Sequence, residues 1–194
     1  IKIPLEQDGI SNHWSGRFTH WLREVQLSTV HGKMVLDETV DTAELLRKKL
    51  LKVNRHLRQV VRNGEYSEKL RLLQSIPGIG LVSAITLLTE MEDILRFRNL
   101  DQLCSFVGLV PSTNSSGEKE NVGRITRRNN RFLRSILVEA AWMASRKDPS
   151  LLYSYGLLCK RMEPTEAIIR IAKKLLNRIR YVMKNETEYV HSVL

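Results

Sequence analysis

One predicted helix ends and another begins within the stretch Leu72-Leu73-Gln74-Ser75-Ile76-Pro77-Gly78-Ile79-Gly80. Pro77 ends the first helix because proline disfavours a helical conformation in the residue before it, and Gly78 permits a tight turn. Ile79 is expected to fill the gap between the two helices. Gly80 would open the second helix with exposed backbone N–H groups at the positive end of the helix dipole. The corner is therefore a candidate site for a bound phosphate, and the alternative is an ordinary helical corner without a ligand.

The rest of the chain reads as a mainly α protein because its apolar residues recur at helical spacing. We expect residues 67–185 to form one compact helical domain and residues 186–194 to form a tail. Helices are predicted in this domain at about 67–75, 80–91, 99–107, 130–146, 149–160 and 164–184.

Residues 1–66 are expected to form a separate helical arm. A short helix is predicted over residues 15–27, and His31-Gly32 would end it. A long helix is predicted over residues 41–63, with Asp41 as its N-cap. Leucines and valines recur along the long helix at coiled-coil spacing, so it is either an arm for self-association or a helix packed on its own domain.

The charge balance points to a polyanionic partner. The 194 residues include 31 Lys and Arg against 21 Asp and Glu, for a net charge of +10, and 42% of the residues are hydrophobic. This composition favours a globular protein that meets nucleic acid. Cys104 and Cys159 form no Cys-x-x-Cys pair, and no apolar run is long enough to cross a membrane. We therefore expect neither a disulfide framework nor a membrane span.

Positive charge is concentrated around a polar loop predicted at residues 111–129. Between Glu118 and Arg134 the chain has six Lys or Arg and two Glu. The helix predicted at 164–184 is also basic, and its charged face could follow a phosphate backbone or simply lie in solvent. The predicted DNA contacts combine the corner with the arginines of the loop region: Pro77, Gly78, Ile79, Gly80, Arg124, Arg127, Arg128, Arg131 and Arg134.

The same loop carries candidate nucleophiles. Ser112, Ser115 and Ser116 lie in it, Ser116 directly before Gly117, and residues 124–126 could form a brief strand. A serine exposed among arginines could attack a phosphodiester, because paired guanidinium N–H groups stabilise charge on the phosphate. The alternative is a basic loop that only binds phosphate.

Two resemblances extend this reading. The corner resembles the helix-hairpin-helix motif of proteins that bind DNA without sequence specificity. The run from Ile76 to Ala141 resembles the C-terminal transposase domain of the insertion sequence 110/116/902 family, which includes Piv-like invertases and bridge-RNA-guided recombinases. The residues that carry this second resemblance are Ile76-Pro77-Gly78-Ile79-Gly80, Leu87-Leu88-Thr89-Glu90, Phe97, Leu103, Gly108-Leu109-Val110-Pro111, Ser115-Ser116-Gly117, Gly123-Arg124-Ile125-Thr126, Leu133-Arg134 and Leu137-Val138-Glu139-Ala140-Ala141. The chain departs from the family at Asn129, where a glycine is usual.

The resemblance implies a DNA transposase or site-specific recombinase with an active site shared between two domains. Members carry an N-terminal RuvC-like domain with four acidic residues that bind Mg²⁺, and a C-terminal domain whose serine attacks DNA. By this match Ser116 is the nucleophile, ahead of Ser115 and then Ser112. No spaced acidic quartet is visible, so we expect the chain to begin after the RuvC-like domain, to hold no metal and to be inactive alone.

The partners implied by the resemblance are DNA, a guide RNA and further copies of the protein in a dimer or tetramer. The expected location is the bacterial cytoplasm, at the nucleoid. Two other interpretations stay open: a non-catalytic helical module that binds nucleic acid, and an oligomerisation module built on residues 41–63.

Overall fold

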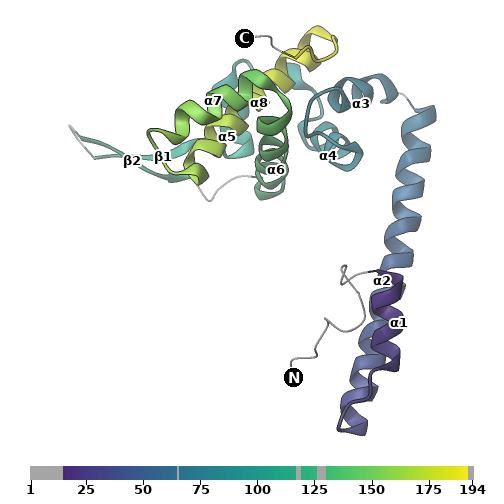
Figure 1. Ribbon diagram of the computed structural model, residues 1–194. Helices are drawn as coiled ribbons and strands as arrows, with labels where there is room; N and C mark the ends of the chain where they lie inside the picture. Colours follow the sequence, from purple (N-terminus) through teal and green to yellow (C-terminus); the bar gives the residue numbers. More distant parts are fainter. Residues whose placement is uncertain (1–14, 65, 117–118, 126–129, 192–194) are drawn as a thin grey trace. The chain divides into compact units, whose positions relative to one another are not determined.

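The computed structural model describes residues 15–64, 66–116, 119–125 and 130–191, and the chain separates into two units between Asn63 and Gly64. Helices dominate both units (Figure 1). The predicted mainly α class is therefore confirmed.

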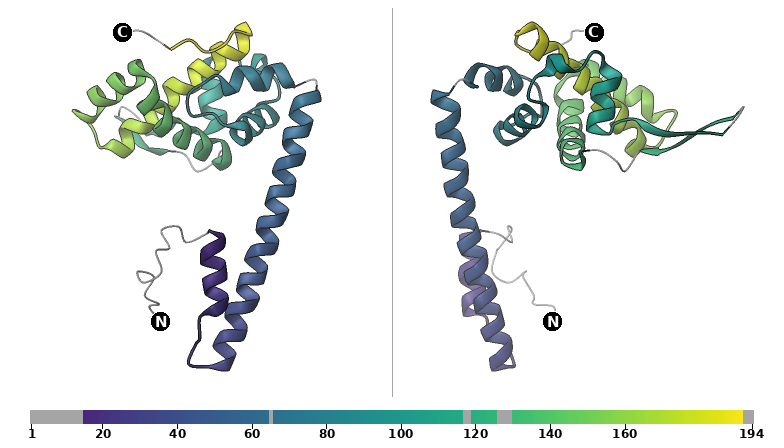
Figure 2. Two further views of the ribbon diagram at one scale, coloured as in Figure 1. Left: turned by 45° about the vertical axis from the view of Figure 1, so that its right-hand side comes forward. Right: turned by 180° about the vertical axis from the view of Figure 1, so that it is seen from behind.

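The first unit is a pair of helices, α1 (Gly16–Glu24) and α2 (Val30–Asn63). The two helices lie side by side in each view (Figure 2). Arg23 of α1 forms ion pairs with Asp41 of α2 at 2.6 Å and with Glu44 at 3.0 Å. These pairs link the two helices but stabilise them little, because exposed ion pairs contribute only about 0–1 kcal/mol.

The start of α2 corrects two predictions. His31-Gly32 was expected to end a helix, yet both residues lie in the first turn of α2. The Thr29 hydroxyl accepts a hydrogen bond from the Gly32 N–H at 3.2 Å, and a Cβ on Gly32 would lie 2.7 Å from that hydroxyl oxygen. The missing side chain of Gly32 thus leaves space for the Thr29 hydroxyl, which accepts a hydrogen bond in the first turn of α2. Asp41 was expected to be an N-cap, but it lies inside α2 and pairs with Arg23.

The second unit contains all remaining elements. They are α3 (Ser67–Gln74), α4 (Leu81–Met91), the short 3-10 helix η1 (Ile94–Arg96), α5 (Leu100–Val107), β1 (Pro111–Ser116), β2 (Lys119–Ile125), α6 (Arg131–Lys147), α7 (Pro149–Cys159) and α8 (Pro164–Asn185). Every helix predicted for this part of the chain is present, and each end lies within one residue of its predicted position.

Helix α8 is the centre of the second unit. It packs against α3, α5, α6, α7 and η1. Its apolar residues recur at helical spacing and are buried together: Ala167, Ile168, Ile171, Ala172, Leu175, Leu176, Ile179 and Val182. Each buried isoleucine or leucine stabilises the fold by roughly 1.5–3 kcal/mol. The core therefore forms around α8, and α3, which leads into the corner, packs against it.

Strands β1 and β2 correct the predicted loop at 111–129. They form an antiparallel hairpin in which Thr113 pairs with Val122 and Ser116 pairs with Lys119. The ladder has an irregularity between Pro111 and Thr113. The hairpin extends away from the helices in Figures 1 and 2. Its sequence shows no alternation of apolar and polar residues, and such alternation is the pattern that reveals a half-buried strand.

Candidate nucleic-acid interface

The corner between α3 and α4 is a tight turn with two buried residues. Pro77 and Ile79 are buried, and the Ile79 N–H donates a hydrogen bond to the Ile76 carbonyl at 3.1 Å. Gly78 between them has φ +88°, a left-handed conformation that favours glycine. Ile79, which was expected to fill the gap between the two helices, is buried, with 5% of its surface exposed.

Gly78 also lies against α6. A Cβ at this position would be 2.4 Å from the carbonyl oxygen of Ala140, well inside van der Waals contact. The glycine therefore serves two purposes: it allows the left-handed turn, and it lets the turn approach the backbone of α6. The corner is consequently held on the same helix that carries Arg131 and Arg134 in its first turns.

The start of α4 is open. Gly80 is its N-cap, and no described side chain accepts a hydrogen bond from the first turn. Gly80 is exposed, and a Cβ built on it meets no atom within 4 Å. By contrast, α5, α6 and α7 are each capped by a side chain, from Asn99, Asn130 and Asp148. The positive end of α4 thus offers backbone N–H groups to an anion.

Helix α6 begins with a fixed polar junction. The Asn130 side-chain oxygen accepts hydrogen bonds from the N–H groups of Phe132 and Leu133, each at 3.1 Å. Its side-chain nitrogen donates to the Glu90 carboxylate at the end of α4, at 2.5 Å. Arg131 is exposed and Arg134 is half-buried. Asn130 therefore joins the first turn of α6, with its two arginines, to the far end of α4.

The predicted nucleophile lies at the tip of the hairpin. Ser116 is the last residue of β1, and its backbone pairs with that of Lys119. Ser115 pairs with Glu120, Ser112 lies earlier in β1, and Arg124 lies in β2. The side chains of residues 111–129 are outside the described part of the structure, and so are Arg127 and Arg128 altogether. Only the backbone of the serine and of Arg124 can thus be located.

Several basic residues of α8 have partners inside the second unit. Lys173 pairs with Asp101 at 3.3 Å, Arg178 pairs with Asp148 at 3.0 Å, and Arg180 donates to the Arg98 carbonyl at 3.2 Å. These residues hold α8 to its neighbours. The basic face of α8 is therefore partly engaged in holding the second unit together.

Residues 186–191 make contacts with the corner that no local pattern indicates. The Tyr189 N–H donates a hydrogen bond to the Ser75 hydroxyl at 2.9 Å, and that hydroxyl donates to the Leu72 carbonyl at 2.7 Å. Arg71 pairs with Glu188. Tyr189 and Ser75 are 114 residues apart in sequence. Only an analysis of coupled positions across related sequences could have brought them together beforehand.

The described residues offer no set of ligands for a metal ion. No group of three or more His, Cys, Asp or Glu side chains in that part of the chain is placed to hold one. The resemblance assigns Mg²⁺ to the RuvC-like domain rather than to these residues. None of the helices in the described ranges combines the length and the apolar character that crossing a bilayer requires.

Residues 70–155 match the family described as Transposase IS116/IS110/IS902. The matched segment runs from α3 to the middle of α7. It therefore contains the corner, the hairpin and the whole of α6.

Several curated proteins are similar to this chain. The transposase for insertion sequence element IS1111A of Coxiella burnetii is 38% identical over 88 residues, which cover 40% of this chain and 24% of that protein. A protein of Pseudomonas aeruginosa named as a family 20 transposase is 26% identical over 160 residues, 80% of this chain and 46% of that protein. The 43.6 kDa protein of insertion element IS110 from Streptomyces coelicolor is 29% identical over 119 residues, 61% of this chain and 29% of that protein. The chain thus spans less than half the length of these relatives.

Proposed function

Residues 70–155 of this chain belong to the IS116/IS110/IS902 transposase family, and on that premise we propose that the second unit holds DNA and supplies a serine nucleophile for transposition. The observation that carries the DNA-binding part is the open, exposed start of α4 at Gly80, next to a turn held against α6. The serine is proposed from the family match, and its backbone position at the tip of the hairpin is compatible with reaching a strand.

DNA binding is proposed to use the backbone rather than the bases. A phosphate would bind at the first turn of α4, where the N–H groups and the helix dipole favour an anion. Arg131 and Arg134 would contact further phosphates, as would Arg124, Arg127 and Arg128 near the hairpin. Contacts of this kind position a duplex without reading its sequence. The corner would then act as a helix-hairpin-helix motif.

In the proposed reaction the hydroxyl oxygen of Ser116 attacks a phosphorus atom of the strand. A bond forms between that oxygen and phosphorus, and one ester bond from phosphorus to a sugar oxygen breaks. The serine gives up its proton, and the departing sugar hydroxyl takes one up. Arginines beside the phosphate would stabilise the charge that develops on its oxygens. The role proposed for this chain is to hold DNA and to supply the attacking hydroxyl.

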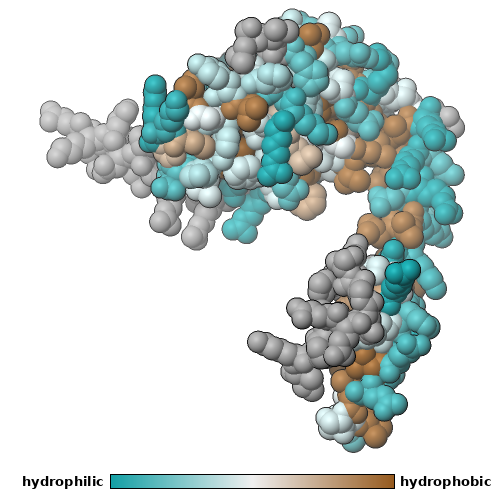
Figure 3. Space-filling model, viewed as in Figure 1, coloured by the Kyte–Doolittle hydropathy of each residue, from teal (hydrophilic) through white to brown (hydrophobic). Residues whose placement is uncertain are grey.

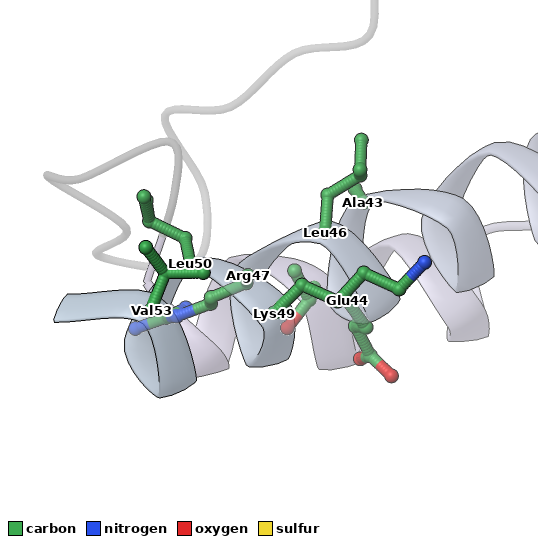
Figure 4. Close-up of a pocket in the computed structure, with 8 residues that line it drawn as sticks. Ala43, Glu44, Leu46, Arg47, Lys49, Leu50 and Val53 are labelled. Atoms are coloured by element: carbon green, nitrogen blue, oxygen red, sulfur yellow. The ribbon is translucent and has the colours of Figure 1, made fainter. Parts of the chain in front are cut away.

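Self-association through α2 is a second candidate function, favoured by an exposed apolar seam. Ala43, Leu46, Leu50, Val53, Leu57 and Val60 recur at alternating three- and four-residue spacing. Leu46, Leu50, Val53 and Val60 are each more than half exposed. Hydrophobic residues are visible along this helix in Figure 3. Four of the seam residues (Ala43, Leu46, Leu50 and Val53) line a groove of about 730 Å³ beside α1 (Figure 4). Such a seam fits a second copy of the same helix.

The variant Gly80→Asp tests the phosphate site. An aspartate N-cap accepts hydrogen bonds from the first turn and places negative charge where the phosphate would lie. We expect unchanged or slightly raised thermal stability but about tenfold weaker binding to a labelled DNA duplex, a loss of about 1.4 kcal/mol, measured by fluorescence anisotropy.

Tyr66→Asp is the matched control for that variant. Tyr66 is the N-cap of α3, it likewise makes no side-chain cap hydrogen bond, and it is exposed. Both variants lower the net charge equally, so the control should bind the duplex within about twofold of the wild type. Equal losses in the two variants would show that net charge alone explains the effect and would rule out a site at α4.

The variant Ser116→Ala tests the nucleophile in the complete transposase that carries this chain. We expect recombination to be abolished while duplex binding is retained, because the hydroxyl is needed for the chemical step alone. Ser115→Ala and Ser112→Ala serve as comparisons and should keep recombination. Recombination by Ser116→Ala at the wild-type level would eliminate the proposed catalytic role.

A further inference from the structure

Arg96, at the end of η1, lies over two neighbouring aromatic rings. Its guanidinium carbon lies 4.8 Å from the ring centre of Phe97 and 4.9 Å from that of Phe106. The two rings are themselves 5.2 Å apart. Both distances to the guanidinium are within the range of a cation–π contact. The rings therefore restrict the orientation of the planar group before any ligand arrives.

The hydrogen bonds of Arg96 leave part of the guanidinium available. One terminal nitrogen donates to the Glu90 carbonyl at 3.3 Å. The other lies 3.8 Å from the Glu92 carboxylate, which is longer than a hydrogen bond. The Arg96 side chain is 40% exposed. Among the described residues, therefore, the outer edge of the guanidinium has only a loose ionic neighbour.

Arg96 lies at the junction from which the hairpin starts and to which it returns. Phe106, one of its two rings, is in α5 just before β1, and the Phe106 carbonyl accepts a hydrogen bond from the Asn130 N–H at 3.5 Å. Glu90 contacts both sides of this junction: its carbonyl accepts from Arg96 and its carboxylate accepts from Asn130. Arg131 follows Asn130 directly. Arg96 and the residue before Arg131 thus meet at Glu90, near the segments that lead into and out of the hairpin.

We propose that Arg96 binds a backbone phosphate of the DNA strand on which the hairpin acts. This inference rests on the proposed DNA-binding function and adds a contact outside the basic run at 118–134. A guanidinium restricted by two cation–π contacts presents its N–H groups as a planar fork, which matches the geometry of two phosphate oxygens. Because the orientation is already set, little side-chain entropy is lost on binding. Arg96 is a positioning residue, since it would register the strand at the hairpin base.

The distance to the corner supports a separate contact. Gly80 and Glu90 lie at opposite ends of α4, about 15 Å apart at 1.5 Å per residue. That is about four base-pair steps of 3.4 Å. One phosphate cannot contact both Arg96 and the start of α4. Each of these two sites should therefore add separately to the slope of log K against log salt.

The test compares Arg96→Met, Arg96→Lys and the matched control Arg161→Met in duplex binding at several salt concentrations. Arg161 is exposed, and its replacement removes the same charge. We expect Arg96→Met to bind about tenfold more weakly and to lower the slope of log K against log salt by about one. Arg96→Lys should keep the slope but lose several-fold in affinity, because lysine lacks the fork. Arg161→Met should stay within about twofold of the wild type.

Three outcomes would overturn the inference. The first is binding by Arg96→Met that equals binding by Arg161→Met at every salt concentration. The second is a loss confined to an RNA duplex of the same sequence. The third is unchanged affinity of Arg96→Lys for the duplex. This variant replaces Arg96→Met as the test if Arg96→Met melts at a much lower temperature than the wild type. Failure of the proposed DNA-binding function would look different from failure of the Arg96 contact. In the first case the wild-type protein would bind no duplex, or Gly80→Asp would bind the duplex as tightly as the wild type.

Discussion

Gly78 and Gly80 stand two residues apart but serve different physical purposes. Gly78 has φ +88°, and its Cβ position is 2.4 Å from the Ala140 carbonyl oxygen. Gly80 has φ −89°, which any residue can adopt, and its Cβ position is open. Gly78 therefore serves the fold, whereas the lack of a side chain at Gly80 leaves a helix start accessible.

Alanine substitutions should separate these purposes. In Gly78→Ala the left-handed conformation and the contact with α6 should each cost about 1–3 kcal/mol, so we expect the free energy of unfolding to fall by about 2–6 kcal/mol. In Gly80→Ala the free energy of unfolding should change by less than about 1 kcal/mol. Urea denaturation of the two variants measures both values. Similar losses in the two variants would contradict the distinct roles.

At the scale of elements, the segment after α8 is fastened through a buried carboxylate. Asp148 is fully buried, and it accepts hydrogen bonds from the Leu151 N–H at 2.8 Å and from the Tyr189 hydroxyl. Arg178 pairs with it at 3.0 Å. Burial alone would raise the pKa of Asp148, but these hydrogen bonds and the arginine outweigh burial and lower it. This group of contacts joins the start of α7 to α8 and to the chain end.

The same contacts give the fold a pH dependence. Burial and the hydrogen bond to Asp148 raise the pKa of Tyr189 from 10.0 to about 12. Between these values the unfolded chain releases a proton that the folded chain retains, so stability should fall as the pH rises through this window. On the acid side, the lowered pKa of Asp148 means that its contribution is present above about pH 4 and lost as the pH falls further.

Tyr189→Phe should weaken the alkaline loss, because the ionising hydroxyl is removed. At neutral pH the lost hydrogen bond should lower its free energy of unfolding by about 1 kcal/mol. Its melting temperature should therefore be lower than that of the wild type. Tyr181→Phe is the control, since Tyr181 is 65% exposed on α8. Melting curves followed by circular dichroism from pH 8 to pH 12 measure the effect. If the melting temperatures of Tyr189→Phe and Tyr181→Phe fall equally between pH 8 and pH 12, ionisation of Tyr189 is not the cause of the alkaline loss of stability.

At the scale of the whole molecule, the two units divide the proposed tasks. The second unit has a core around α8 and carries every residue proposed to meet DNA. Among the described residues of the first unit, Val40 is the one buried hydrophobic residue. Much of the apolar seam of α2 is exposed. Exposed apolar surface of this kind indicates an interaction site.

A charge in the seam of α2 should prevent self-association. We expect wild-type protein to sediment as a dimer or tetramer and Leu50→Glu to sediment as a monomer, because burying a carboxylate in a coiled-coil seam is costly. Leu51→Glu is the control, since Leu51 is similarly exposed, at 58% against 61% for Leu50, but lies off the seam. Sedimentation velocity measures the mass. Monomeric wild-type protein at micromolar concentration would contradict this function for α2.

The sequence alone was sufficient for the mainly α class, the helices of the second unit and the sharp corner at Gly78. These features depend on apolar spacing and on proline and glycine, whose effects act within a few residues along the chain. The family resemblance also came from the sequence, because it depends on the order of short motifs.

Only the tertiary structure decided which residues meet across the chain. It brought Gly78 to Ala140, Tyr189 to Asp148 and Arg96 to Phe106. It also showed that α4 starts without a side-chain cap and that residues 111–116 pair with residues 119–125 as strands. Contacts of this kind arise from packing between segments far apart in the sequence, and no local pattern of residue types encodes which partner will be close.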